Sequence, residues 1–289
     1  MSDCSLLYGR SLLKEEVDVR LIREKEDLIR IKPAFTTVEG KKVCSRCSAV
    51  PDLSRAYPCT CGGNCLYCRE CINLGKVREC GRFYSITEPN RFDRHARPYL
   101  KWRGTLSEQQ KEASDAITES VRNNKELLVW AVAGAGKTEM LFKALADALE
   151  AGKRVCITSP RIDVCLELAP RIQESFPTVP MAVLYGGAEE SYVYTQLVIA
   201  TTHQLYRFEE AFDVLIIDEV DAFPFHMNAA LLFAAEKARK KRSSRICLTA
   251  TPDQSMQKRV RKGKLEAVIL PARYHGHALP VPKAVFHGE

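Results

Sequence analysis

Several features that would decide the class of a protein at once are missing from this sequence. Its 289 residues contain no run of 18 apolar residues, and the first residues carry neither a basic segment nor a long apolar stretch. On the sequence alone we therefore expect no transmembrane segment and no secretory signal peptide, but a soluble, cytoplasmic protein. Internal repeats and low-complexity tracts are also missing. The apolar content of 46% is enough for one core of ordinary size and a smaller appendage.

Acidic side chains are scarce in one part of the chain. Residues 237–264 contain eleven Lys or Arg and a single Asp, which gives this stretch a local charge of +10. The whole chain has a net charge of +7, so the remaining residues together carry −3. A focused positive charge attracts a polyanion, which favours a nucleic-acid partner. The alternative is that residues 237–245 form the solvated end of a helix, where cations are favoured by the negative C-terminus.

A phosphate-binding loop is the clearest motif that is present. Residues 131–138 read AVAGAGKT and lie between the apolar run LLVW and a stretch with helical periodicity. Small residues let backbone N–H groups surround phosphate oxygens, and the following helix points its positive end at the same anion. This context predicts an ATP site in which Lys137 reaches the β- and γ-phosphates and Thr138 ligates Mg²⁺. The expected ATP-binding residues of this loop are Ala133, Gly134, Ala135, Gly136, Lys137 and Thr138.

The other half of such a site is an acidic pair that follows another buried strand. Residues 212–220 read FDVLIIDEV, a β-branched run that carries Asp218 and Glu219 to the carboxyl edge of a parallel sheet. We expect Asp218 to hold Mg²⁺, and Glu219 to orient and deprotonate the attacking water. Lys137, Asp218 and Glu219 are thus the expected catalytic residues, and Asp221 completes a DEVD tetrad.

Further stretches occur in the order typical of a superfamily 2 helicase core, which the sequence resembles. Residues 106–110 resemble an element whose last glutamine recognises adenine, and the resemblance gives this role to Gln110. Two further stretches, at residues 159–161 and 201–203, offer hydroxyl groups, helix N-termini and an arginine. These groups are suited to bind the sugar-phosphate backbone of one nucleic-acid strand. The alternative is that Ser159 and Thr202 only cap helices. The resemblance implies DNA contacts at Ser159, Pro160, Arg161, Thr201, Thr202 and His203, and coupling of hydrolysis to strand binding at Thr249, Ala250 and Thr251.

Eight of the twelve cysteines lie between residues 44 and 80. Paired CxxC spacing matches tetrahedral zinc sites with thiolate ligands, and a cytosolic chain disfavours disulfides. We expect one structural Zn²⁺ site built from two CxxC pairs. The first pair is Cys44 with Cys47, and in the second pair Cys68 can have either Cys71 or Cys65 as its partner. Two sites would need all eight thiolates. The expected site comprises Cys44, Cys47, Cys68 and Cys71, and a second candidate site comprises Cys59, Cys61, Cys65 and Cys80.

These anchors define the expected organisation. Strands that alternate with helices of ten to fifteen residues predict an α/β fold: a RecA-like P-loop domain whose parallel sheet has helices on both faces, plus a small N-terminal cysteine zinc module. Alternation at Val17, Val19 and Leu21 predicts a strand in a hairpin-like leader. The expected parts are the leader (1–40), the zinc module (41–82), a linker (83–104), the RecA-like helicase ATP-binding domain 1 (105–270) and a connector to a second domain (271–289).

The whole combination resembles the ComFA-type late-competence DNA-uptake ATPases. The most specific string is DEVDAFPF at 218–225, and the others are YCREC, AVAGAGKTE, SPRIDV, ATTHQLYRF and PARYHG. The resemblance implies an ATP-driven motor on single-stranded DNA. It further implies work at the inner face of the membrane, where the motor helps to draw transforming DNA through a membrane channel together with other competence proteins.

The resemblance also raises a question about turnover. Such motors have two RecA-like domains, and an arginine from the second contributes roughly 10³ to 10⁵ in rate in related enzymes. The sequence ends 38 residues after Thr251, so we expect weak binding and slow hydrolysis unless a second lobe is supplied in cis or in trans. Two alternatives remain open: a nucleotide-gated DNA-binding adaptor without turnover of its own, and a replication-restart-like helicase, in which the cysteine module interrupts the later motor region.

Overall fold

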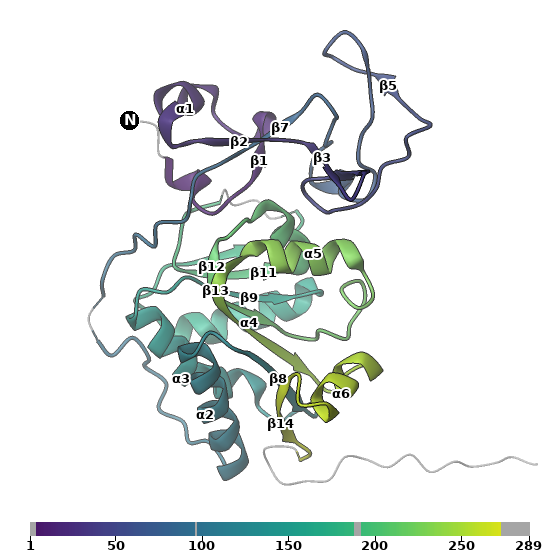
Figure 1. Ribbon diagram of the computed structural model, residues 1–289. Helices are drawn as coiled ribbons and strands as arrows, with labels where there is room; N and C mark the ends of the chain where they lie inside the picture. The colour runs from purple at the N-terminus through teal and green to yellow at the C-terminus, as the bar shows by residue number, and fades with distance from the viewer. Residues whose placement is uncertain (1–3, 96, 188–191, 273–289) are drawn as a thin grey trace, which may run out of the picture.

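The computed structural model describes residues 4–95, 97–187 and 192–272, and its centre is a sheet of seven parallel strands (Figure 1). Their spatial order is β10-β11-β9-β12-β13-β8-β14. Parallel neighbours need crossover connections, and helices occupy most of these. The strands are β8 (Glu126–Ala131), β9 (Val155–Ser159), β10 (Met181–Leu184), β11 (Leu197–Thr201), β12 (Phe212–Ile217), β13 (Arg239–Thr249) and β14 (Glu266–Leu270).

The strand sequences explain why both faces of this sheet are covered. Successive side chains of a strand point to opposite faces. In β9, Val155 and Ile157 belong to the hydrophobic core on the first face, whereas Cys156 belongs to the core on the second face. In β12, Ile216 faces the first core and Leu215 the second. A sheet that is apolar on both faces requires a layer of cover on each.

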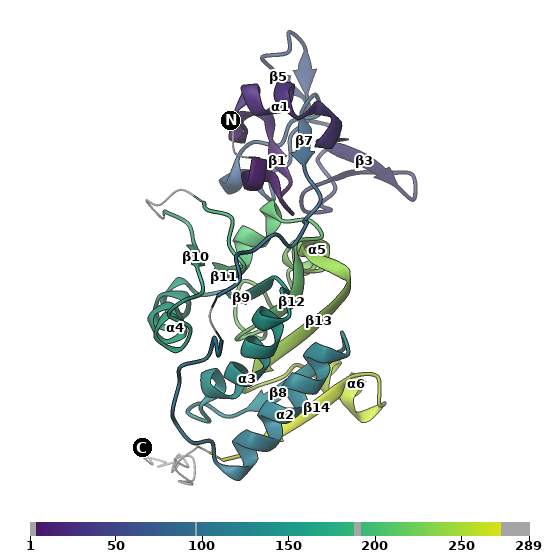
Figure 2. The same ribbon diagram turned by 90° about the vertical axis from the view of Figure 1, so that its left-hand side faces the viewer.

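Helices supply much of that cover on both sides. Helices α2, α3 and α4 contribute to the first core, and α5 with the 3-10 helix η5 contributes to the second (Figure 2). The expected α/β fold with a parallel sheet between helices is therefore confirmed. The helices of this domain are α2 (Glu108–Arg122), α3 (Lys137–Glu150), α4 (Ile162–Ser175), η5 (Thr202–Arg207), α5 (Ala229–Ala238) and α6 (Gln254–Arg261).

The N-terminal region, residues 4–85, consists of short elements. Strand β7 pairs with both β1 and β2, so the residues expected to begin a linker instead complete this sheet. The hairpin β3–β4 spans the boundary expected at residue 40. The elements are η1 (Cys4–Leu7), β1 (Leu12–Leu13), η2 (Lys14–Glu16), α1 (Val19–Glu24), η3 (Glu26–Leu28), β2 (Arg30–Pro33), β3 (Phe35–Val38), β4 (Lys41–Cys44), β5 (Tyr57–Pro58), β6 (Asn64–Cys65), η4 (Ile72–Leu74) and β7 (Arg82–Ser85).

The strand expected around Val17, Val19 and Leu21 is wrong. This segment forms helix α1, and Asp18 starts the helix by accepting a hydrogen bond from the backbone N–H of Arg20. Val19 is exposed while Leu21 is buried, so the alternating apolar residues do not share one buried face. A helix-capping residue therefore outweighs a short period-two pattern here.

The N-terminal region packs on the second face of the RecA-like domain. Leu13 and Phe83 of that region share one hydrophobic cluster with Tyr206 of η5 and with residues of α5. Lys237 at the end of α5 is half-buried, and its Nζ donates to the carbonyl oxygens of Arg46 and Tyr206, both at 3.0 Å. The two parts of the chain therefore share a core.

The stretch after β7 carries a second polar anchor to the sheet. Nη1 of Arg154, at the start of β9, lies 2.5 Å from Oε2 of Glu88, and both side chains are fully buried. Tyr194 donates its hydroxyl to the same carboxylate. The residues expected to be a linker thus contribute a buried ion pair to the RecA-like domain.

Candidate active site

The phosphate-binding loop forms where the sequence motif predicts it, between β8 and α3. Gly134 and Gly136 have φ angles of +78° and +74°, in the left-handed region that favours glycine. A Cβ on Gly136 would lie 2.3 Å from Nε2 of Gln110, so the loop also leaves no room for a side chain at that position. Because α3 begins at Lys137, the N–H groups of its first turn face the loop. The backbone is therefore shaped for an anion.

Lys137 and Asp218 meet at the carboxyl edge of the sheet. The Lys137 Nζ lies 3.6 Å from Oδ1 of Asp218, and about a fifth of each side chain is exposed. The two residues follow β8 and β12, which are separated only by β13. The backbone N–H of Asp218 donates to the Thr158 carbonyl at 2.8 Å, which continues the pairing of β12 with β9. The structure thus brings together two residues that are 81 positions apart in the sequence.

Glu219 has an unusual environment for a carboxylate. Its φ angle is +53°, uncommon for a residue other than glycine. Its Oε2 is buried, and no residue in the described ranges donates a hydrogen bond to it, although Arg161 Nη1 lies 3.7 Å away. Burial raises the pKa of Glu219, against the opposing effect of Arg161. A partly desolvated acceptor of this kind is suited to bind and deprotonate a water molecule.

Gln110 ties the start of α2 to the phosphate-binding loop. Its side-chain oxygen accepts from the Ser107 N–H at 2.9 Å, and its Nε2 donates to the Ala135 carbonyl at 2.9 Å. The Ser107 hydroxyl in turn accepts from the Gln110 N–H, which completes a capping box. The glutamine therefore lies against the phosphate loop as well as at the cavity wall.

Gln110, Lys137, Asp218 and Glu219 line a cavity of about 660 Å³. Trp102 and Arg171 are among the lining residues that were not recognised in the sequence. Trp102 lines the wall next to Gln110 and packs edge-on against Phe142 of α3. Arg171 of α4 is a further lining residue, and its Nη2 lies 2.5 Å from Oε1 of Glu139. The aromatic and basic composition of residues 91–103 was the available signal for the tryptophan. The dimensions of the cavity are typical of a small-molecule site.

The expected coupling residues contact the DEVD tetrad. Thr249 donates its hydroxyl to Oδ1 of Asp221 at 2.5 Å, and Thr251 donates to Oδ2 of the same carboxylate. Burial alone would raise the pKa of Asp221, but these two hydrogen bonds outweigh it and lower the pKa. Ala250 is partly exposed between them, and its carbonyl accepts from the Trp130 indole at 3.1 Å. The end of β12 is thereby joined to the end of β13.

The expected DNA-contacting residues divide by exposure. Ser159, Pro160, Thr201 and Thr202 are buried, whereas Arg161 and His203 are exposed. Ser159 accepts a hydrogen bond from the backbone N–H of Arg161 at 3.3 Å, next to the start of α4. The Thr202 hydroxyl is buried without a partner in the described residues, so it does not cap η5. Only the two exposed side chains can reach a strand without rearrangement.

Residues 239–245 of the basic stretch do not form the end of a helix, because α5 ends at Ala238 and the next residues belong to β13. In a parallel sheet the start of β13 lies at the edge opposite to Thr249. Arg239, Arg245 and Arg259 converge there on Glu126, with the nearest N–O distances at 3.4, 2.7 and 3.0 Å. Much of the charge that favoured a nucleic acid is therefore paired within the protein.

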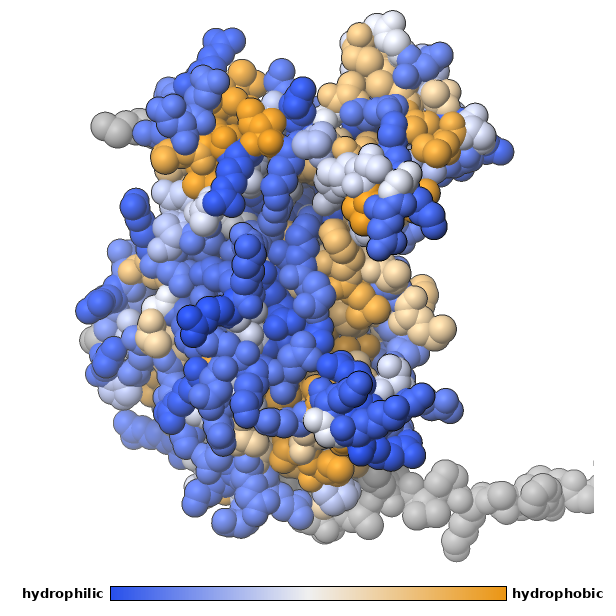
Figure 3. Space-filling view, viewed as in Figure 1, coloured by the Kyte–Doolittle hydropathy of each residue, from blue (hydrophilic) through white to orange (hydrophobic). Residues whose placement is uncertain are grey.

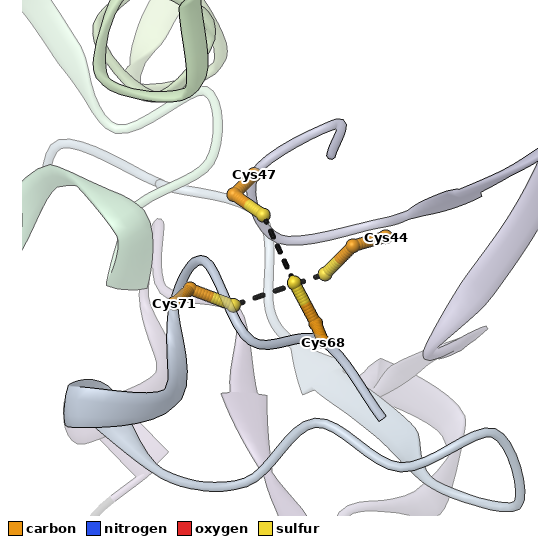
Figure 4. A group of neighbouring side chains, drawn as sticks. All are labelled: Cys44, Cys47, Cys68 and Cys71. Carbon is orange, nitrogen blue, oxygen red and sulfur yellow. Dashed lines mark hydrogen bonds between the residues drawn. The ribbon is translucent and has the colours of Figure 1, made fainter. Parts of the chain in front are cut away.

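The eight clustered cysteines form two separate groups of four. Cys44, Cys47, Cys68 and Cys71 are buried and converge on one point (Figure 4). Their Sγ atoms lie 3.9 Å apart between Cys44 and Cys71, and 3.5 Å apart between Cys47 and Cys68. Four thiolates at 2.3 Å from one tetrahedral Zn²⁺ are about 3.8 Å from each other. This first tetrad therefore has the dimensions of a zinc site.

The competing pair of Cys65 with Cys68 is wrong. The structure places Cys65 in the second tetrad, with Cys59, Cys61 and Cys80. The two groups have the members predicted for the expected site and for the second candidate site, and in each group all four sulfur atoms lie within 4.8 Å of one another. Sequence spacing allowed either pairing, and only the fold separates them.

A groove lies beside the first tetrad and the start of α5. Its apolar lining residues are Cys47, Ala49, Phe223, Met227 and Phe233, its polar ones include Ser48, Glu70, His226 and Asn228, and some apolar surface is visible beside α5 (Figure 3). Phe223 is 88% exposed, although it follows the DEVD tetrad by only two residues. Apart from Cys47, these residues were not recognised individually from the sequence, and the apolar end of DEVDAFPF was the available signal for Phe223.

Comparison with known families agrees with this geometry. Residues 103–254 match the family model for the type III restriction enzyme, res subunit, and residues 3–85 match the model for the competence protein ComFA N-terminal domain. The fold and the site define a helicase-like P-loop ATPase domain. The chain belongs to the helicase-like family that the res-subunit model describes, since this model spans more than half of the chain.

Its relatives are more specific than that class. The chain is 44% identical over 292 residues to competence protein ComFA of Bacillus subtilis (strain 168), with 98% of this chain and 62% of the relative covered. It is 41% identical over 266 residues to ComFA of Streptococcus pneumoniae (strain ATCC BAA-255 / R6), with 92% and 60% covered. The resemblance to ComFA-type proteins is therefore confirmed, and the chain spans about three fifths of the length of these relatives.

More distant matches complete the comparison. Replication restart protein PriA of Rickettsia felis (strain ATCC VR-1525 / URRWXCal2) is 27% identical over 192 residues, with 61% of this chain and 29% of the relative covered. A hypothetical ATP-dependent RNA helicase from Sulfolobus tokodaii has a TM-score of 0.45 and 20% identity, with 57% of this chain and 53% of that chain covered. Among the described residues, none of the helices combines the length and the apolarity needed to cross a bilayer.

Proposed function

We propose that this chain is the ATP-hydrolysing lobe of a motor that acts on single-stranded DNA during competence, and that it contributes to DNA uptake. The observation that carries the proposal is the approach of Lys137 to Asp218 beside a partly desolvated Glu219. The two ComFA relatives, both named competence proteins, support the biological setting. The PriA matches cover much less of the chain at lower identity, so they give the replication-restart alternative weaker support.

The residues of the site fit ATP with Mg²⁺. The left-handed Gly136 and the N-terminus of α3 present backbone donors to a phosphate, and Lys137 adds a cation. When bound, Mg²⁺ neutralises charge on the phosphates. Asp218 and the Thr138 hydroxyl would hold it, Glu219 would take the proton of the attacking water, and Gln110 would recognise adenine from its place beside the phosphate loop.

Arg161 and His203 are the proposed contacts with the DNA backbone, since they are exposed. Arg161 also lies near Glu219. A strand that draws the guanidinium away from the carboxylate would change the environment of the base. Asp221 with Thr249 and Thr251 would transmit such a change from β12 to β13. These placements give a route from strand binding to hydrolysis.

We further propose that turnover by this chain alone is slow. In helicase-like motors an arginine from a second RecA-like lobe stabilises the transferred phosphoryl group. The nucleotide-gated adaptor is the alternative, and turnover distinguishes the two. The proposed place of work is the cytoplasmic side of the membrane, next to a DNA channel and other competence proteins, and it rests on the ComFA relatives alone.

The first tetrad is proposed to hold structural Zn²⁺. Its four thiol groups are buried, and they share the hydrophobic cluster of α5 and η5, so a bound metal would stabilise the contact between the N-terminal region and the RecA-like domain. Structural zinc sites are closed, with four protein ligands, as this one would be.

ATP turnover with and without single-stranded DNA tests the motor proposal. We expect slow hydrolysis that DNA stimulates and that increases when a second RecA-like lobe is supplied in trans. Lys137→Ala should abolish hydrolysis. Lys143→Ala is the matched control, because Lys143 is on the same helix but pairs with Asp115 at the surface. Nucleotide binding without turnover, even with DNA and the second lobe present, would leave only the adaptor.

A further inference from the structure

The second tetrad is assembled from two segments of the chain, the hairpin β5–β6 and the stretch that leads to Cys80. A turn carries Cys59 and Cys61, in which Cys59 N–H donates to the Gly63 carbonyl at 2.9 Å. Cys65 ends the short strand β6. Cys80 follows a stretch that is held to residues 66–68 by backbone hydrogen bonds such as Glu79 N–H to Leu66 O at 2.9 Å. The hairpin and the stretch that leads to Cys80 therefore bring four sulfur atoms to one place.

The sulfur distances match one metal ion. The Sγ atoms of Cys59 and Cys80 lie 3.6 Å apart, and those of Cys61 and Cys65 lie 3.5 Å apart. All four lie within 4.8 Å of one another. Tetrahedral zinc thiolate sites have sulfur atoms about 3.8 Å apart, whereas a disulfide brings two sulfur atoms to about 2.05 Å. The geometry is that of four ligands around a common centre.

The surrounding chain gives this segment little other means of folding. Residues 52–64 contain no buried side chain, and β5 and β6 pair only two residues each. A hairpin of this size is not stable in water by itself. None of the four cysteines belongs to the hydrophobic cluster that contains the first tetrad. The order of this hairpin therefore needs a stabilising element besides a core.

The charges around the tetrad also fit a metal complex. Zn²⁺ with four thiolates carries a net charge of −2. Lys14, Lys76, Arg78 and Arg82 line the same depression as Cys61 and Cys80, and the lining also includes the acidic residue Glu15. An excess of cations nearby stabilises a dianionic complex by Coulomb attraction.

We propose that Cys59, Cys61, Cys65 and Cys80 hold a second structural Zn²⁺ ion, which folds the hairpin β5–β6. The chain then carries two zinc ions in different settings. The first is buried in a core shared with the RecA-like domain, and the second is near the surface, with Cys61 and Cys80 exposed. The second ion should therefore leave first when a chelator is added. This proposal does not depend on ATP hydrolysis.

The zinc content of the intact chain, purified under reducing conditions and measured by elemental analysis, tests this directly. We expect about two equivalents in the wild-type protein and about one in the double variant Cys61→Ser with Cys80→Ser. ATP binding should be retained in the variant. Cys4→Ser is the matched control, since Cys4 is outside both tetrads, and it should keep two equivalents.

The rate at which a chelator removes zinc from the wild-type protein gives a second test, which holds even if the double variant does not fold. Release of zinc in two phases of equal amplitude, with the faster one missing from the double variant, supports the proposal. Zinc content that is the same in the wild-type protein and in the double variant, at one or at two equivalents, would overturn it. Disulfides between these cysteines in place of the second zinc, seen by mass spectrometry after alkylation, would also overturn it.

Discussion

Thr249 donates its hydroxyl to Oδ1 of Asp221 at 2.5 Å, and this bond joins the ends of two adjacent strands of the sheet. Asp221 is three residues after Asp218, and Thr249 ends β13. A movement of either strand end is therefore transmitted to the other strand end. The bond gives a physical link between the proposed nucleotide site and the residues expected to couple hydrolysis to strand binding.

Thr249→Val removes this bond while preserving the shape of the side chain. ATP binding should be retained, because Thr249 does not line the cavity. The stimulation of hydrolysis by single-stranded DNA should fall several-fold, since Asp221 loses one of its two hydroxyl partners. Turnover measured against DNA concentration checks this result. Unchanged stimulation would show that the bond has no role in coupling.

Glu219→Gln should separate catalysis from stability. Loss of a general base lowers turnover by roughly 10² to 10⁴, so hydrolysis should almost stop while ATP still binds. The variant should also be more stable at neutral pH, by about 1 kcal/mol, because a buried carboxylate oxygen without a hydrogen-bond donor is replaced by a neutral group. ATPase assays and urea unfolding measure the two effects.

The pH dependence of Glu219 has a defined sign. Burial raises the pKa of Glu219 in the folded state above its unfolded value. The folded state therefore binds this proton more tightly than the unfolded state does. Protonated Glu219 stabilises the fold at low pH, and this contribution is lost as the pH rises through the pKa of the folded state. Hydrolysis needs the deprotonated carboxylate of Glu219. When the pH is lowered, the rate of hydrolysis should therefore begin to fall at a higher pH than it would with a glutamate of ordinary pKa. The Gln variant should lose this pH dependence of stability.

Glu88→Gln should destabilise the protein strongly. Arg154 and Glu88 are both fully buried, and breaking such a pair leaves an uncompensated charge at a penalty of about 3–5 kcal/mol. Asp115→Asn is the matched control, because it removes a carboxylate from the exposed pair with Lys143. That change should alter the free energy of unfolding by less than about 1 kcal/mol. Equal effects in urea unfolding would contradict this interpretation.

Glu126→Gln should expose the role of the paired basic residues. Burial alone would raise the pKa of Glu126, but the guanidinium groups of Arg245, Arg259 and Arg239 outweigh it, so the pKa is lowered. A lowered pKa stabilises the fold above the unfolded pKa, and this contribution is lost as the pH falls through the folded value. The variant should therefore lose about 1.5–3 kcal/mol at neutral pH, from charge-assisted hydrogen bonds.

The free energy of unfolding measured at acidic pH checks the same prediction. With Gln at position 126, the free energy of unfolding should change less between neutral and acidic pH than it does in the wild-type protein. Loss of the anion also frees cations at this edge of the sheet. An increase in nonspecific DNA affinity that disappears at high salt would accompany the loss of stability.

Much of the fold follows from local patterns in the sequence. The run before the loop forms β8, the periodic stretch after it forms α3, and FDVLII forms β12. Each of these elements is decided by residues within one short window. The helix α1 is the counterexample, because its apolar residues alternate and only the capping role of Asp18 distinguishes it from a strand.

What the sequence by itself determined is the chemistry at the sheet edge: a contiguous loop motif and a contiguous acidic pair, each following an apolar strand. Parallel strands bring such motifs to one edge whatever the rest of the chain does. Only the tertiary structure decided which cysteines group together, which arginines are paired by Glu126, and that Glu88 is buried with Arg154. These contacts join residues far apart in the chain, and their formation depends on packing and desolvation, which residue spacing does not encode.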